Sequence, residues 1–592
     1  MNAERASPSG ERTVSVPAGS RIDIRGSLPR AALVAAVTIF VLTAAELLFG
    51  LRPGIETLLF LNDVQSLLVI VAVLLAVAFW RIPAVLSGSA WRVPPPRLTA
   101  PLLALLAGMA CLAGTYLVFG RYALSYDEVM AVFDAEIFRS GLRIAPLPSE
   151  WRGFRHALAP SFLLPVPGEV AWVSAYLPVN AALRALVGSA ADPAWTGPIL
   201  LIVAVLALNG IARQLWPDRP DAAFVATLLL VTAPQVLATA MTPYAMTAHL
   251  AFNLVWLRLF LRGGLLGHAG AAATGVLACG LHQLVFHPLF AAPFLVFLIV
   301  DRRWRLAVFY GTVYAAAGLV WILYWQVLLA AQPDAGNAAA AVGADWFLRR
   351  FTTLLAAFDP GSFDLMTKNL LRFAAWQNPL LLPLVGLAWP AFRRGERPAW
   401  SLGAGIGLTL LVVAVLLPFQ GHGWGYRYLH GLIGSACLLA ARGWIALTER
   451  ATASQAAAAR GALTVSCLAA LLVLIPVRAH DVRDAVAPYA AASRAIGSAD
   501  ADIVALRAGG ALYGRDLVRN DPFLRNRPII VLLDDLDAAH RAALCSRGRI
   551  VEFGPQEARR FGIVGDYREE SPASSRNVLP CTTGRVTVPE RY

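Results

Sequence analysis

The chain has 592 residues, of which 58% are hydrophobic and 15% charged, and its formal net charge is +13. Soluble domains carry about 25% charged residues, so this composition excludes a soluble globular protein and indicates a polytopic membrane protein. The positive charge does not indicate nucleic-acid binding. Arginines cluster in short loops at every second membrane exit, as the positive-inside rule expects, and form no basic stripe interleaved with aromatic residues.

The N-terminal part of the chain is expected to be a tail followed by two membrane helices. Residues 1–30 are polar and rich in Ser, Gly and Arg, which predicts a flexible cytoplasmic tail. Residues 31–98 contain apolar runs near 31–50 and 58–80. Each run is long enough to cross about 30 Å of hydrocarbon, so both predict transmembrane helices.

The next part, residues 99–477, is predicted to be the main membrane domain. Its clearest apolar runs lie near 99–119, 195–213, 222–240, 245–262, 269–282, 288–300, 306–330 and 461–477. With the apolar segments between 378 and 447, the total is about thirteen spans in an all-α polytopic fold. One orientation satisfies the arginine loops: the N-terminus is inside, and loops 121–194 and 331–377 are outside.

Residues 478–592 differ from the rest and predict a small extracytoplasmic α/β domain. The stretches ADIVALRA, RPIIVLLDD and GRIVEFG read as short buried strands, and LDDLDAAHRAALCSRG reads as a helix. Cys545 and Cys581 are the only cysteines outside the predicted spans. They either form a disulfide, as an oxidising compartment permits, or stay unpaired, and the sequence leaves both possibilities open. We expect the chain in a bacterial inner membrane.

The first external loop carries the main candidate for chemistry. In SYDEVMAVFDAEIFRSG, apolar residues recur at helical spacing, which predicts an amphipathic helix at the membrane interface. Ser125 and Glu128 match a capping box, and Asp127 lies in the first turn, where the helix dipole favours an acid. Asp134 follows two turns later on the same face as Asp127. The two adjacent acids are therefore either catalytic or only caps of the helix.

The predicted spans contain almost no ionisable residues, so any chemistry is expected in the external loops. Basic residues that could bind a phosphate occur in and after the second external loop and in the short loop QGHGWGYRY: Arg349, Arg350, Lys368, Arg372 and Arg427. Arginines in an amphipathic stretch such as DWFLRRFTTLLAAFD can equally well face lipid headgroups.

His282 and His287, in LHQLVFHP, are further candidates. They are either metal ligands or, as is commoner for two histidines in a short loop, hydrogen-bonding and substrate-contacting groups. The second external hairpin, TAPQVLATAMTPYAMTAHL, contains no acid, which argues against a divalent metal held by a carboxylate there. The sequence therefore assigns no metal ligand and no certain cofactor.

These motifs together resemble those of the GT-C integral-membrane glycosyltransferases, in particular the protein mannosyltransferase and aminoarabinose transferase branch. An acidic pair opens an interfacial helix directly after a membrane helix in that family. AYLPVNAALRALVG resembles the family's segment before the next span, and GWGYRYLHGLIGSACLLAARG resembles its late helix with an Arg-Tyr motif. The resemblance covers residues 100–447, and the two N-terminal helices precede it.

The resemblance implies a specific reaction. Members transfer a sugar from a polyprenyl-phosphate donor in the membrane to a lipid, glycan or protein acceptor on the outer side. Carried over, it implies Asp127 as the general base, Glu128 as its helper, and Arg427 with the other basic candidates as donor-site residues. A base assists a hydroxyl nucleophile, and cations stabilise the leaving phosphate.

Two other functions remain open from the sequence. A flippase or transporter of lipid-linked sugars would need polar residues along a path through the bilayer. A ligase or polymerase of lipid-linked glycans would share the large external loops and the arginines, but would not need the acid pair. The sugar, the acceptor and the oligomeric state are not readable from the sequence.

Overall fold

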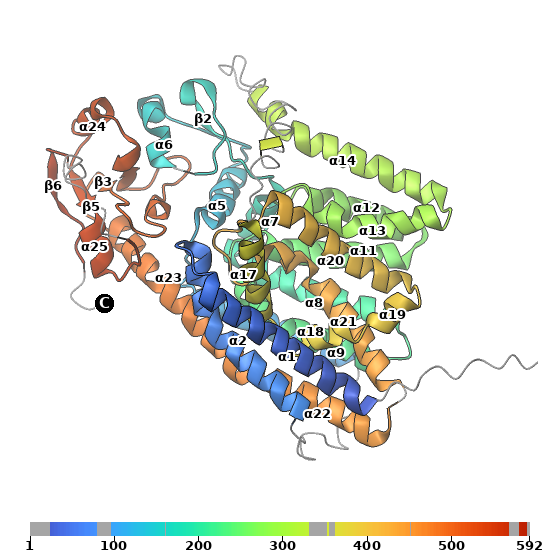
Figure 1. Cartoon of the computed structure of the whole chain (residues 1–592). Coiled ribbons are helices and arrows are strands. Elements are labelled where there is room, and N and C mark those ends of the chain that lie inside the picture. Colours follow the sequence, from blue (N-terminus) through green and yellow to red (C-terminus); the bar gives the residue numbers. More distant parts are fainter. Residues whose placement is uncertain are drawn as a thin grey trace, which may run out of the picture.

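The computed structural model describes residues 24–79, 96–159, 161–330, 352–353, 361–449, 451–566 and 579–588. Arg349 and Arg350 lie outside these ranges, as do residues 1–23 of the predicted tail and much of the predicted loop 331–377. Within them, the protein is a helical membrane bundle with a small mixed domain at one end (Figure 1).

The N-terminal helices form an antiparallel pair on one side of the bundle (Figure 1). They are α1 (Ile24–Phe49) and α2 (Ile55–Phe79), and α4 (Pro96–Leu117) follows them. Helix α1 begins before the predicted end of the tail at residue 30. Helix α2 packs against α17 (Ser362–Ala375) of the main bundle, so the two extra helices are attached to the bundle.

The main bundle follows the apolar runs of the sequence. Its helices are α8 (Thr196–Leu215), α9 (Pro220–Val231), α10 (Pro234–Ala240), α11 (Met246–Arg262), α12 (Gly264–Cys279), α13 (Phe286–Val300), α14 (Trp304–Ala330), α17 (Ser362–Ala375), α18 (Leu381–Gly386), α19 (Trp389–Arg393), α20 (Arg397–Leu416), η4 (Arg427–Leu432) and α21 (Ile433–Thr448). Helix α9 ends before Pro234, because the residue that precedes a proline is unfavourable in a helix, and α10 continues at an angle of 59°.

The membrane-protein prediction is confirmed, whereas the count of thirteen spans is not. By length and composition, the described residues contain eight helices able to cross a membrane, or up to nine if α9 and α10 form one bent span. Several predicted spans correspond to shorter apolar helices, such as α12 and α13.

Residues 121–194, which the sequence predicts to form the first external loop, fold into a layer over one end of the bundle. It contains α5 (Tyr126–Arg139), β1 (Ala145–Pro146), η1 (Ser149–Phe154), α6 (Arg155–Leu158), η2 (Pro167–Glu169), β2 (Ala171–Trp172), α7 (Val179–Gly188) and η3 (Pro193–Trp195). The predicted amphipathic helix is therefore present, and α5 packs against α7. Strands β1 and β2 pair antiparallel and close the loop.

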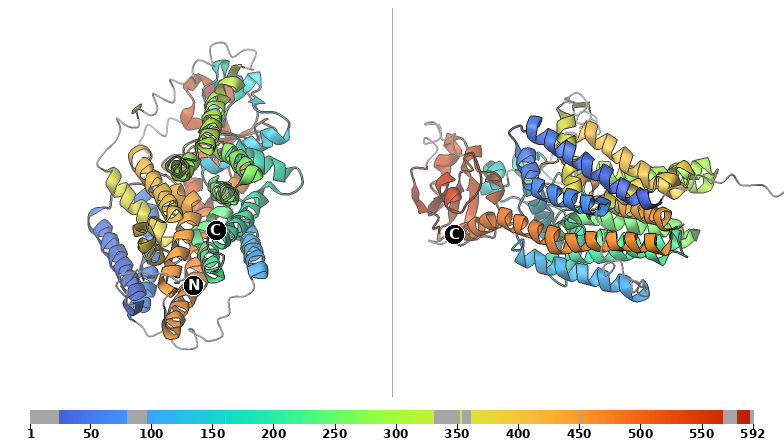
Figure 2. Two further views of the ribbon diagram at one scale, coloured as in Figure 1. Left: turned by 90° about the vertical axis from the view of Figure 1, so that its right-hand side faces the viewer. Right: turned by 60° about the horizontal axis from the view of Figure 1, so that its bottom comes forward.

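A long helix connects the bundle to the C-terminal domain (Figure 2). It comprises α22 (Ala453–Ala469), a π-helical turn (Ala470–Leu474) and α23 (Ile475–Gly497). The expected domain boundary at residue 478 falls inside this helix, because the helix continues beyond the apolar run that predicted the last span.

The predicted strands of the C-terminal domain are confirmed. β3 (Ile503–Leu506), β4 (Ile529–Leu532), β5 (Ile550–Phe553) and the unpredicted β6 (Thr582–Arg585) form a parallel sheet in the order β4-β3-β5-β6. The remaining elements are η6 (Arg515–Leu517), η7 (Leu533–Asp535), α24 (Ala538–Leu544) and α25 (Pro555–Arg560). Strands β3 and β4 are fully buried, as parallel strands usually are. Cys545 and Cys581 form a disulfide.

The C-terminal domain docks on the folded first loop, as Figure 1 shows for the red domain beside α6 and β2. The indole Nε1–H of Trp172 donates to the carbonyl of Pro522 at 2.8 Å. Arg525 forms an ion pair with Glu136 of α5 at 3.1 Å. Segments that are 350 or more residues apart in the sequence therefore meet at the end of the bundle.

Candidate functional site

Helix α5 begins with the predicted capping box. The backbone N–H groups of Ser125 and Leu124 both donate to Oε2 of Glu128 at 2.9 Å. The Glu128 side chain is completely buried, and this burial raises its pKa to about 7, although the hydrogen bonds from Ser125 and Leu124 oppose the shift. The Glu128 side chain therefore holds the backbone at the start of α5 in place.

Asp127 precedes Glu128 in the chain and contacts residues of two other segments, Arg427 and Tyr176. Its Oδ2 accepts from Nη1 of Arg427 at 2.5 Å, and its Oδ1 accepts from the hydroxyl of Tyr176. The side chains of Asp127 and Arg427 are 13% and 11% exposed. The structure thus joins two residues that the sequence singled out, 300 positions apart.

Arg427 is presented by a loop that depends on glycine. Gly421 and Gly425 have φ values of +63° and +75°, which disfavour other residues. A Cβ atom at Gly425 would lie 2.5 Å from Oε1 of Gln235, so glycine also permits this close approach. The backbone N–H of Arg427 donates to Oε1 of Gln420 at 3.0 Å, which closes the loop.

Aromatic residues surround the guanidinium group of Arg427. It lies 5.6 Å from the ring centre of Tyr244 and 5.4 Å from that of Tyr428. The Tyr244 hydroxyl is 2.7 Å from Oγ of Ser125, which links the acid-free second hairpin to the start of α5. Tyr176 lies in AYLPVNAALRALVG and Tyr244 in the acid-free hairpin, but no pattern there singled out either tyrosine. Only the folded chain brings Tyr176 to Asp127 and Tyr244 to Arg427.

Of the two candidate histidines, the structure places only His282 beside this group. Its ring stacks on Tyr176 with the centres 4.8 Å apart, and burial lowers its pKa to about 4, so the imidazole is neutral. His287 lies inside the bundle, where its ring nitrogens contact Asn253 at 2.8 Å and Tyr314 at 2.7 Å.

Lys368 and Arg372 lie on α17 and contact the N-terminal helices. The Lys368 ammonium is 2.9 Å from the carboxylate of Glu46 and 2.6 Å from that of Asp364. Arg372 contacts Asp63 of α2 at 3.1 Å and donates to the carbonyl of Gly423 at 2.5 Å. Arg372 thus reaches the Arg427 loop, whereas Lys368 connects α17 to α1.

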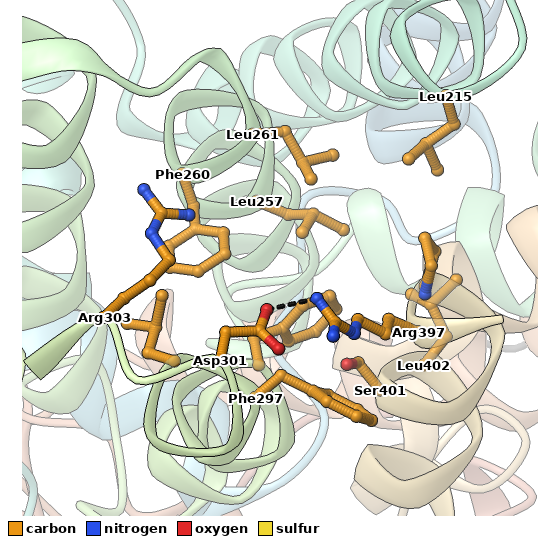
Figure 3. A pocket seen from close by; sticks show the side chains of 13 residues that line it. Leu215, Leu257, Phe260, Leu261, Phe297, Asp301, Arg303, Arg397, Ser401 and Leu402 are labelled. Carbon is orange, nitrogen blue, oxygen red and sulfur yellow. Dashed lines mark hydrogen bonds and ion pairs between the residues drawn. The ribbon is translucent and has the colours of Figure 1, made fainter. Parts of the chain in front are cut away.

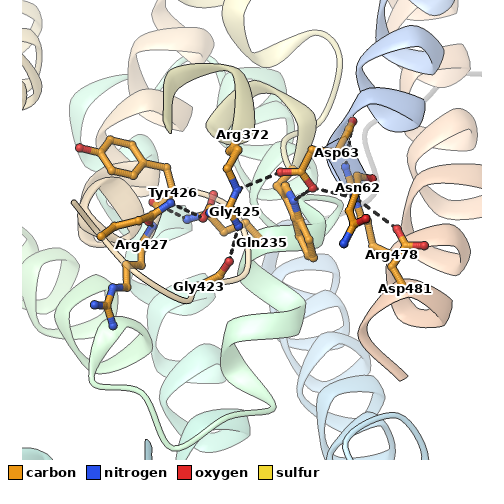
Figure 4. A network of polar contacts seen from close by, with 12 residues as sticks. Asn62, Asp63, Gln235, Arg372, Gly423, Gly425, Tyr426, Arg427, Arg478 and Asp481 are labelled. Carbon is orange, nitrogen blue, oxygen red and sulfur yellow. Dashed lines mark hydrogen bonds and ion pairs between the residues drawn. The ribbon is translucent and has the colours of Figure 1, made fainter. Parts of the chain in front are cut away.

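Asp63 is a residue that the sequence analysis overlooked. Its carboxylate accepts from Arg372, from Arg478 at 2.8 Å and from the indole of Trp376 at 2.8 Å (Figure 4). A single acid inside the apolar run 58–80 is a signal that could have identified it, since intramembrane acids need partners. The expectation that the spans hold almost no ionisable groups is therefore wrong at this point.

Other features of the structure lie apart from Asp127. Asp134 lines a small cavity together with Tyr176, Ser174 and Tyr324. Burial raises the pKa of Asp134 to about 7. A larger apolar cavity lies among α11, α13 and α20, next to the ion pair of Asp301 and Arg397 (Figure 3). Among the described residues, no group of three or more His, Cys, Asp or Glu side chains is arranged to hold a metal ion.

Similar proteins were found among solved structures. No family model matches the sequence, and no curated protein matches it. Among solved structures, ArnT from Cupriavidus metallidurans bound to undecaprenyl phosphate is similar with a TM-score of 0.45 and 13% identity, over 72% of this chain and 85% of that one. Its apo structure is similar with a TM-score of 0.42 and 14% identity, over 80% and 88%. Both solved structures are of the same protein, ArnT.

Proposed function

We propose that the protein is a glycosyltransferase that moves a sugar from a polyprenyl-phosphate donor to an acceptor on the extracytoplasmic face. The observation that carries the proposal is the contact between Asp127 and Arg427 at the end of a membrane bundle. A base and a cation are the two groups that this transfer needs, one for the incoming hydroxyl and one for the leaving phosphate.

The two groups suit these roles because of their surroundings. Asp127 is held by Tyr176 and by the first turn of a capped helix, so its position is fixed before a substrate arrives. Arg427 is nearly buried among aromatic rings, where its attraction for a phosphate is screened less by water than at the surface. Preorganised groups of this kind stabilise developing charge without rearrangement.

The proposed sequence of events uses both side chains. The donor phosphate approaches Arg427 and competes with Asp127 for its N–H groups, which frees the carboxylate. Asp127 then accepts the proton of the acceptor hydroxyl as the oxygen attacks the anomeric carbon, and the C–O bond to the phosphate breaks. The electron pair of that bond stays on the phosphate, next to Arg427.

The test of this proposal is the variant Asp127→Asn. We expect turnover to fall by about 100-fold or more, since a positioned general base contributes that much, while binding of the donor is kept because Arg427 is unchanged. Purified protein is incubated with radiolabelled polyprenyl-phosphate sugars and membrane extract, and label is followed into the acceptor fraction.

Glu136→Gln is the matched control, because Glu136 is an acid of the same helix that pairs with Arg139 and Arg525 outside the site. It should transfer sugar at the wild-type rate. Wild-type activity in Asp127→Asn would refute the base assignment. Movement of labelled lipid across vesicles without covalent transfer would instead identify a flippase.

A further inference from the structure

One segment of the C-terminal domain, between β3 and β4, is fixed against the turn that opens α5. The backbone N–H of Tyr126 donates to Oδ2 of Asp516 at 3.1 Å, so an acid of the C-terminal domain caps this helix together with its own capping box. The guanidinium of Arg519 lies 3.8 Å from the ring centre of Tyr122 and donates to the carbonyl of Leu124 at 3.3 Å. The segment is therefore part of the wall of the site.

Tyr513 lies in this segment and has an unusual conformation. Its φ is +53°, a left-handed backbone that aromatic residues rarely adopt and that is typical of functional sites. Its ring lies perpendicular to that of His422, with the centres 5.3 Å apart. The preceding carbonyl, that of Leu512, accepts from the hydroxyl of Tyr489 at 2.7 Å. The fold thus holds the Tyr513 side chain against the Arg427 loop.

The hydroxyl of Tyr513 is buried and has no hydrogen-bond partner within the described ranges of the chain. Burial raises the pKa of this phenol, so it keeps its proton at neutral pH and can donate it. A buried donor without a partner in the protein needs an explanation, and a bound ligand that accepts its hydrogen bond is one. Asp516 adds to this rise of the pKa, and the charges of Arg372 and Arg427 oppose it.

The neighbouring loop and helix α17 carry more buried nitrogens without a partner. Both ring nitrogens of His422, Nε1 of Trp424, Nη1 of Arg372 and Nε of Arg427 are buried and lack partners among the residues that the structure describes. The rings of His422 and Trp424 lie 4.7 Å apart. Arg372 donates to the carbonyl of Gly423. Gly423 also lies close to the Arg427 side chain, because a Cβ atom at this position would be 3.3 Å from Cδ of Arg427. These groups therefore surround one short loop.

Such a cluster calls for a ligand rich in acceptors and negatively charged. Two guanidinium groups that keep a free N–H beside neutral donors suit the oxygens of a phosphate, because charge-assisted hydrogen bonds are the strongest. Burial lowers the pKa of His422 to about 3, so its imidazole is neutral and donates one proton without adding charge.

We infer that the C-terminal domain completes the donor site: the Tyr513 hydroxyl donates a hydrogen bond to a phosphate oxygen of the polyprenyl-phosphate donor, next to Arg372 and Arg427. This inference rests on the function proposed above. It makes the C-terminal domain a part of substrate binding, in addition to its contacts with the first loop.

The experiment measures binding of undecaprenyl phosphate to the full-length protein in detergent. Tyr513→Phe removes only the hydroxyl, and we expect its affinity to fall about tenfold or more, as for the loss of a hydrogen bond to a charged group. Affinity for undecaprenol, which lacks the phosphate, should be unchanged. The thermal midpoint should stay at or above that of the wild type, because the lost hydroxyl has no partner in the protein.

Tyr116→Phe is the matched control, since its hydroxyl, at the end of α4, donates to Asp192 at 2.6 Å in an exposed contact. It should bind undecaprenyl phosphate like the wild type. Equal affinity of Tyr513→Phe and wild type, with the wild type binding and transferring normally, overturns this inference and leaves the proposed function standing. Failure of the wild type to bind any polyprenyl phosphate overturns both.

Discussion

At the scale of single residues, two adjacent acids have different surroundings and hence different roles. Asp127 is mostly buried, with 13% of its side chain exposed, and meets Arg427 and Tyr176. Glu128 is completely buried, and its Oε2 accepts from three groups at the start of α5. Because successive residues of a helix point about 100° apart, Asp127 faces Arg427 and Tyr176 while Glu128 anchors the start of the helix.

Glu128 should make the stability of the protein depend on pH. Its pKa in the folded state is about 7, above the ordinary value of 4.5, so the folded protein binds this proton more tightly than the unfolded chain. The free energy of unfolding should therefore fall as pH rises from 4.5 through 7, by about 3 kcal/mol at most for this one group. Thermal unfolding across this range should be flatter in Glu128→Gln, whose amide oxygen still accepts from the cap.

Glu136→Gln serves as the control here as well, because Glu136 lies on the same helix but pairs at the surface. It should keep the wild-type pH profile. If the profile of Glu128→Gln matches that of the wild type, Glu128 does not titrate in this range.

At the scale of elements, buried ion pairs attach the N-terminal helices to the bundle. Asp63 of α2 meets Arg372 of α17 and Arg478 of α23, and the side chains of all three are at most 3% exposed. A buried pair adds little net stability compared with apolar packing, but removal of one partner leaves a charge buried without compensation. These contacts therefore specify which helix faces meet, and they hold Arg372 beside the Arg427 loop.

Asp63→Ala should be strongly destabilising, by about 3–5 kcal/mol, since Arg372 and Arg478 both lose their shared carboxylate. Thermal unfolding in detergent measures the loss. Asp301→Ala breaks a pair whose arginine, Arg397, is 58% exposed, and it should cost about 1 kcal/mol or less. Equal midpoints for the two variants would contradict a structural role for the Asp63 cluster.

At the scale of the whole molecule, the arginine loops and the position of the C-terminal domain lead to one expected orientation. Asp127, Arg427 and the C-terminal sheet lie at the same end of the bundle, and the arginine-rich loops predict that this end is outside. A disulfide between Cys545 and Cys581 suits an oxidising compartment. The other four cysteines are buried.

This pattern allows a simple test of orientation with a membrane-impermeant maleimide on spheroplasts. We expect no labelling of the intact protein, because its free cysteines are buried, and labelling of Cys545 and Cys581 after treatment with an impermeant reductant. Cys545→Ser/Cys581→Ser, which has no disulfide to open, should stay unlabelled under both conditions. Labelling only after the membrane is permeabilised would place the C-terminal domain inside.

Local sequence patterns predicted the membrane fold, the helix at 126–139 and three strands of the C-terminal sheet, all of which the structure contains. These features depend on local patterns: long apolar runs, a capping box and short runs of β-branched residues. The number of spans did not follow as directly, because helices shorter than the bilayer thickness carry a weaker signal.

Only the tertiary structure decided which of the candidates meet. Arg427 joins Asp127, while Lys368 pairs with Glu46, and His287 lies inside the bundle. Contacts between residues hundreds of positions apart depend on how whole helices pack, and no periodicity in the sequence records that. The same reason applies to Tyr176, which contacts Asp127, and to Asp516 of the C-terminal domain, which caps α5. Their contacts depend on the folded chain and were not predicted from the sequence.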